Sequence, residues 1–102
     1  MDKQTVKKLR ELVKQGKDKE VLTSLDSILL INPRDVFALL NLSIFMIGQG
    51  KMTEAMELEK KALKIDRDCI AQFKENSIFP ESGYNLTSEG QAWLLEALKD
   101  LE

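Results

Sequence analysis

The chain has few side chains with which to carry out covalent chemistry. It contains one cysteine, Cys69, and no histidine, so it offers no His-based general base, no internal disulfide and no Cys/His zinc site. The remaining candidates are two close pairs of carboxylates, Asp66 with Asp68 and Glu57 with Glu59. Residues two positions apart on a helix do not share a face, so neither pair favours acid–base catalysis. The sequence therefore predicts a protein that is not an enzyme and holds no metal or cofactor.

Basic side chains supply the other chemistry, the binding of anionic groups. Residues 1–20 carry seven basic and four acidic side chains, whereas residues 81–102 carry one basic and five acidic ones. Cations at helical spacing near the N-terminus share one stripe and are able to bind carboxylates through charge-assisted hydrogen bonds. This basic stripe is Lys3, Lys7, Arg10 and Lys14. No aromatic residue is interleaved with them to stack on bases, and the net charge is −2, so we expect no nucleic-acid partner.

Length and composition indicate the class of protein that carries this stripe. The chain has 102 residues, of which 43% are apolar and 31% charged. These values are typical of one soluble helical domain and not of a disordered chain. Apolar stretches such as Val36 to Ile47 are too short to span a bilayer, and the N-terminus lacks the apolar core of a signal peptide. We therefore expect a cytoplasmic protein with no membrane partner.

A repeat predicts the elements that position the basic side chains. Gln15-Gly16-Lys17 and Gln49-Gly50-Lys51 are the same tripeptide 34 residues apart. A fixed offset of this size, with a glycine between two apolar-periodic segments, indicates stacked helix-turn-helix units. The predicted helices of the first two units span about 2–15, 21–29, 34–48 and 54–65. We expect each glycine to end the helix before it in a left-handed conformation.

Side-chain caps are expected where two of these helices begin. Asn32 is predicted to cap the third helix with Pro33 in its first turn, where the missing donor costs nothing. Thr53 is predicted to cap the fourth helix, with Met52 as a hydrophobic staple. The third helix is apolar nearly all round, so we expect it to be covered on most sides.

The last third of the chain departs from this pattern. A short helix over about 68–77 should stop before Phe79-Pro80, because the residue before a proline disfavours the helical conformation. Cys69 lies near its start, and we favour a structural, partly buried cysteine over a reactive thiol. A final helix is predicted over about 89–101, with an apolar arc wider than one core requires.

At this point the residues resemble the tetratricopeptide repeat. The matches in the second unit are Asn41-Leu42-Ser43, Gln49-Gly50, Glu54-Ala55, Ala62-Leu63 and Asp66. The resemblance implies an all-α, right-handed superhelical array of about six helices in one domain, 1–102. Its units would be a first repeat over 2–35, a second over 36–69, and a degenerate third with a capping helix over 70–102. The first unit has Leu9, Val21 and Ile28 where small residues are usual, so we expect its helices to cross less closely.

The resemblance also implies where a partner protein binds. In this family the first helix of each pair lines a concave groove. The resemblance therefore predicts a module that binds a peptide or helix of another protein, including an acidic peptide or helix. The expected groove residues are Lys3, Lys7, Arg10, Lys14, Phe37, Leu40, Asn41, Ile44 and Lys74. Of the chaperone-tail clamp known in one sub-family only Asn41 is matched, so that ligand is not expected. The alternative for the apolar members is that they are core residues covered by the chain itself.

A second functional class is self-association. The apolar arc of the predicted last helix leaves surface for a homodimer, for a further repeat, or for folding of that helix into the groove. The residues expected to self-associate are Trp93, Leu94, Leu95 and Leu98.

Overall fold

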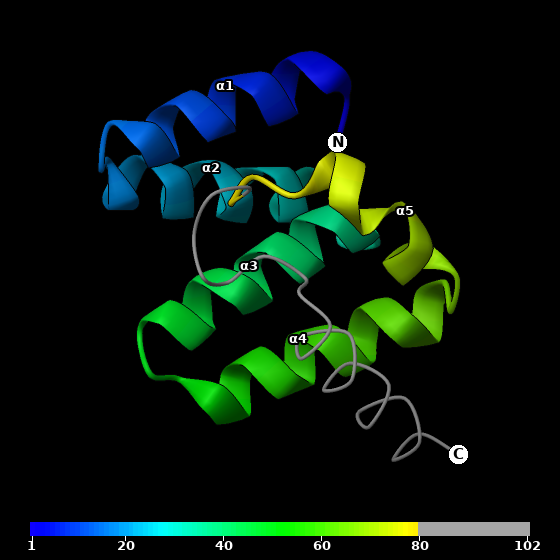
Figure 1. The fold of residues 1–102 in the computed structure, drawn as a ribbon. Coiled ribbons are helices and arrows are strands. Elements are labelled where there is room, and N and C mark those ends of the chain that lie inside the picture. Colours follow the sequence, from blue (N-terminus) through cyan, green and yellow to red (C-terminus); the bar gives the residue numbers. More distant parts are fainter. Residues whose placement is uncertain (80–102) are drawn as a thin grey trace.

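The computed structural model describes residues 1–79, and within them the protein is all-α, with helices packed in the order of the sequence (Figure 1). The helices are α1 (Lys3–Lys14), α2 (Asp18–Ile31), α3 (Val36–Gly48), α4 (Met52–Ile65) and α5 (Cys69–Asn76). The predicted order of long helices and the short helix before Phe79 are confirmed. The helix predicted over 89–101, with Trp93, Leu94, Leu95 and Leu98, lies outside the described residues.

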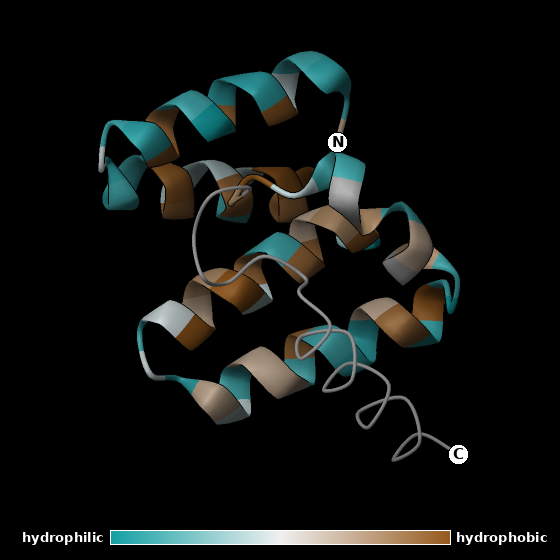
Figure 2. Cartoon of the chain, in the orientation of Figure 1, coloured by the Kyte–Doolittle hydropathy of each residue, from teal (hydrophilic) through white to brown (hydrophobic). Residues whose placement is uncertain are grey.

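α3 lies in the middle of the array and contacts α2, α4 and α5. Seven consecutive residues, Ala38 to Ile44, are buried, which confirms that an all-round apolar helix is covered on most sides. α1, by contrast, is apolar on one face only, and its other face is hydrophilic (Figure 2). The helix that is apolar nearly all round therefore lies at the centre, and the helix with one apolar face lies at the edge.

Small residues allow α3 and α4 to share the most extensive contact of any pair of helices in residues 1–79. Ser43, Ala55 and Ala62 are all buried where these helices meet. Side chains of this size let two helix backbones approach closely. α1 and α2 use Leu9 and Val21 instead and contact each other less extensively, as expected.

The turn between α1 and α2 and the turn between α3 and α4 have the same geometry. Gly16 and Gly50 have φ values of 71° and 77°, which confirms the left-handed conformation predicted for both. The amide of each glycine donates to the carbonyl three residues back, and the next amide donates to the carbonyl five residues back, as in Lys17 to Leu12 at 3.0 Å. This is the Schellman arrangement, in which orphan carbonyls at a helix end find donors.

The predicted cap of α3 is wrong. Asp35, not Asn32, precedes the first helical residue, and its Oδ1 accepts from the Ala38 amide at 3.1 Å. Asn32 instead ends α2, and its Oδ1 accepts from the Arg34 amide at 3.2 Å. An Asx turn therefore uses the Asn32 side chain, which moves the start of the helix beyond Pro33.

The predicted cap of α4 is also wrong. α4 begins at Met52 with Lys51 before it, and no side chain caps this end, so Thr53 lies inside the helix and Met52 is not a staple residue outside it. The reason is the turn at Gly50, which already bonds the Lys51 amide to Met46 at 2.9 Å. The chain passes from this turn directly into α4, leaving no separate capping residue.

We expect Gly50→Ala to lower the free energy of unfolding by about 1 kcal/mol, through the cost of a side chain at positive φ. The added Cβ would meet no atom within 4 Å, so conformation alone is tested. Gly48→Ala is the matched control, because Gly48 lies at the end of α3 and has no positive φ. That change should stabilise the protein by about 0.5 kcal/mol. Urea unfolding of both variants would contradict this account if the two changes had the same sign.

Candidate functional site

The four cations of the basic stripe lie together along α1. They line a cavity of about 460 Å³ whose opposite wall is the end of α5. The residues that line it are Lys3, Val6, Lys7, Arg10, Glu11, Lys14, Glu75 and Asn76. The lining therefore contains four cations and two carboxylates, and the excess of positive charge favours an anionic occupant.

Three of these cations are available to a ligand. Lys3, Lys7 and Lys14 are exposed, and within residues 1–79 none of them forms an ion pair. Lysine side chains of this kind are strongly hydrated point charges on flexible stems. They are suited to attracting carboxylates, and they contribute little to the stability of the fold.

Arg10 behaves differently from the lysines. Its Nε donates to the Ser77 carbonyl at 2.8 Å, and its Nη2 donates to the Glu75 carbonyl at 3.1 Å. Both acceptors are main-chain oxygens at or just beyond the end of α5, where unpaired carbonyls favour a cation. Arg10 therefore binds the chain itself and holds the far wall of the cavity in place.

Asn41 is the buried polar residue in the middle of the predicted groove. Its side chain is 0% exposed and forms three hydrogen bonds. Nδ2 donates to the Phe37 carbonyl at 2.9 Å and to the Asn76 carbonyl at 3.0 Å, and Oδ1 accepts from the Ile78 amide at 2.9 Å. The side chain of Asn41, which was expected to face a ligand in the groove, is thus bonded to the main chain of this protein.

The apolar members of the predicted groove belong to the core. Leu40 and Ile44 are buried, and Phe37 is half-buried and packs against the same cluster. The alternative that the chain itself covers these residues therefore describes this structure. Lys74 is in α5, beside the cavity-lining Glu75.

Three buried residues that follow α5 and lie next to the groove residue Asn41 in the structure were not identified from the sequence. Ser77, Ile78 and Phe79 follow α5 and are all buried. Their signal in the sequence was an apolar pair directly after a polar helix end, which we interpreted only as a stop before Pro80. We call these three residues the 77–79 segment.

Cys69 is the first residue of α5 and is fully buried. Burial, with a smaller effect of the Asp66 carboxylate, raises the pKa of its thiol to about 11. A thiol with so high a pKa is protonated at neutral pH and is a poor nucleophile. The structural role expected for this cysteine is consistent with its position.

Glu59 is the buried ionisable residue of α4, with 2% of its surface exposed. Its Oε1 lies 3.2 Å from the Ser43 Oγ, and within residues 1–79 its Oε2 has no partner. Desolvation raises the pKa of this carboxyl to about 8. Ser43 also lies 3.0 Å from the Leu40 carbonyl, so a protonated Glu59 can donate to Ser43 while Ser43 donates to Leu40. Glu57 is exposed, and the two carboxyls form no paired site.

Comparisons with known proteins give no relative. No protein-family model, curated protein or solved structure matches this chain. Within residues 1–79, no helix is both long enough and apolar enough to cross a membrane.

Glu59 should make the stability of the protein depend on pH. Because its pKa is about 4.5 unfolded and about 8 folded, its stabilising effect is fully present below pH 4.5 and is lost as the pH rises to about 8. The free energy of unfolding should fall by up to about 1.4 kcal/mol per pH unit inside this window. The chain has no histidine to add a competing titration.

Urea unfolding between pH 5 and 7.5 measures this effect. Glu59→Gln should remove the slope, because the amide is neutral at every pH and can still donate to Ser43. Glu57→Gln, at an exposed position of the same helix, should keep the slope of the parent. Equal slopes in the two variants would show that Glu59 is not the titrating group.

Proposed function

We propose that this chain is a tetratricopeptide-type array that binds an acidic segment of a partner protein along α1. The repeat is supported by the two glycine turns 34 residues apart, which share one hydrogen-bond pattern and nearly one φ value. It is supported further by small residues at the α3–α4 crossing. Arrays of this kind usually serve as binding surfaces, because each unit adds a helix to a continuous concave face.

The observation that carries the binding function is the cavity beside α1. Its three exposed lysines form no ion pair within residues 1–79, and the surrounding residues leave the cavity with an excess of positive charge. An acidic segment would satisfy these charges and would be attracted over several ångströms before contact. Because the lysines remain hydrated, the attraction should weaken as salt is added.

The spacing of the lysines indicates the length of the bound segment. Lys3 and Lys14 are separated by about 16 Å along the helix axis. That distance corresponds to about five residues of an extended peptide or about eleven of a helix. A short acidic stretch is therefore long enough to contact all three lysines.

The test reverses the charges that are free and leaves Arg10 unchanged, because Arg10 also holds the chain itself. A Lys3/Lys7/Lys14→Glu variant should fold as the parent does and bind a partner isolated with the parent domain at least about tenfold more weakly. Its affinity should also depend less steeply on salt. Binding would be measured by titration calorimetry at two salt concentrations.

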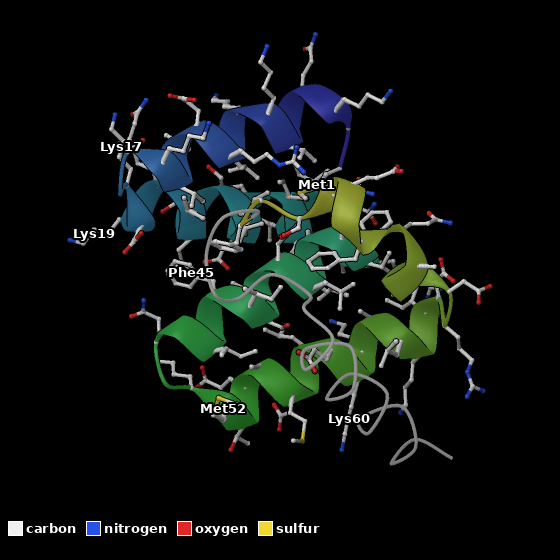
Figure 3. The ribbon with its side chains drawn as sticks, viewed as in Figure 1. Met1, Lys17, Lys19, Phe45, Met52 and Lys60 are labelled. Atoms are coloured by element: carbon white, nitrogen blue, oxygen red, sulfur yellow. The ribbon has the colours of Figure 1, made fainter. Side chains whose placement is uncertain are left out.

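A Lys19/Lys61/Lys64→Glu variant is the matched control. It changes the net charge by the same amount at exposed positions of α2 and α4, and Lys19 projects outward near the turn after α1 (Figure 3). This variant should keep most of the affinity of the parent. If both triple variants weakened binding equally, net charge and not the α1 cavity would explain the interaction.

A further inference from the structure

The 77–79 segment is non-helical main chain buried inside a helical protein, extended at Ser77 and bent at Ile78. Ser77 has φ −70° and ψ 134°, and Ile78 and Phe79 are 0% and 9% exposed. The segment runs back from the end of α5 between α1 and α3 (Figure 1). Ile78 and Phe79 belong to the same apolar cluster as Leu40 and Ile44. The apolar side chains of the segment therefore share one core with apolar residues that the resemblance assigned to the groove.

Side chains from two helices bind both edges of this segment. Asn41 of α3 donates to the carbonyl of Asn76 and accepts from the amide of Ile78, two residues later. In a parallel pair of strands, one residue likewise donates to a carbonyl of the neighbouring strand and accepts from the amide two residues later in that strand. The Ser77 carbonyl lies between these groups, faces the other edge of an extended chain, and accepts from Arg10 of α1.

Every one of these contacts is made to main-chain atoms. Asn41 and Arg10 therefore recognise an extended peptide without reading its side chains, which is how strand addition gives affinity. Selectivity would come from the two side chains that follow Ser77, because these are the apolar side chains that the segment places in the core. The segment thus has the properties of a bound peptide that happens to belong to the same chain.

We propose that Arg10 and Asn41 form a clamp for an extended peptide main chain, with the 77–79 segment as its intramolecular occupant. A partner segment with two consecutive bulky apolar residues binds the clamp by displacing this occupant. The proposal rests on the proposed function, because both concern one groove. The lysines form its outer half, and the clamp of Arg10 and Asn41 forms its inner half. The apparent affinity of the full chain is reduced by the small fraction of molecules in which the clamp is open.

The probe for this clamp is an uncharged peptide, acetyl-Gln-Asn-Ser-Ile-Phe-amide, which copies residues 75–79 with glutamine in place of Glu75. Binding to the full chain is followed by NMR, with the side-chain amide of Asn41 as the reporter. An Ile78→Ser/Phe79→Ser variant, in which the occupant has lost both apolar side chains, should bind the probe at least about tenfold more tightly than the parent. A control peptide with Ser-Ser in place of Ile-Phe should not bind either protein.

Two results would overturn the clamp. One is equal affinity of the parent and the double serine variant for the probe, and the other is binding of the Ser-Ser peptide as well as the probe. Adding Asn41→Ala to the double serine variant should abolish binding of the probe. Because the probe has no charge, Lys3/Lys7/Lys14→Glu should leave its affinity unchanged. Failure of the acidic-segment proposal and failure of the clamp are therefore separate outcomes.

Hydrogen exchange in the parent chain provides a measurement that needs no variant to fold. The Ile78 amide donates to Asn41, so displacement of the occupant by excess probe should speed the exchange of this amide at least about threefold. The Val21 amide, bonded to the Lys17 carbonyl in the first turn of α2, should be unaffected and serves as the internal reference. Unchanged exchange at Ile78 in excess probe would show that the occupant is not displaced.

Discussion

The arrangement of residues 1–79 depends on one buried side-chain amide. Asn41 uses both donor hydrogens and its acceptor oxygen, and two of its three partners are main-chain groups at the end of α5 and beyond it. A buried polar group that loses its partners costs about 1 to 3 kcal/mol. Departure of the end of α5 from the groove therefore loses these hydrogen bonds, unless another main chain with a carbonyl and an amide at the same spacing replaces it. In the proposed interaction, occupation by the chain and occupation by a partner would therefore be competing ways of satisfying the hydrogen bonds of Asn41.

α3 holds Asn41 in position because its opposite face is fixed against α4. Ser43 and Ala62 allow the close approach of these two helices, and the neutral carboxyl of Glu59 closes a short polar chain between them. Contacts of this kind are rigid, because close packing leaves little room for a second arrangement. The 77–79 segment adds no regular secondary structure to the fold. Flexibility in the groove is therefore expected in its occupant and not in its walls.

The sequence predicted what local chemistry determines. Helix positions follow from apolar periodicity, and the turns at Gly16 and Gly50 follow from the need for positive φ. The predicted cap of α3 is wrong because two suitable side chains, Asn32 and Asp35, compete, and only the folded chain shows which amide each one meets. The predicted cap of α4 is wrong because the turn at Gly50 leads directly into that helix. The contacts of the groove failed for a different reason. Asn41 bonds residues 35 and 37 positions away, and Arg10 bonds one 67 positions away, so no local pattern contains them.

The two halves of the proposed groove would bind a partner by different physical interactions. The lysines of the outer half are hydrated, so their attraction for a partner acts at a distance and is screened by salt. Asn41 in the inner half is fully buried, so its hydrogen bonds form only after contact and are little affected by salt. A partner with an acidic stretch beside an apolar pair would therefore associate at a salt-dependent rate, whereas its dissociation would depend mainly on the buried pair.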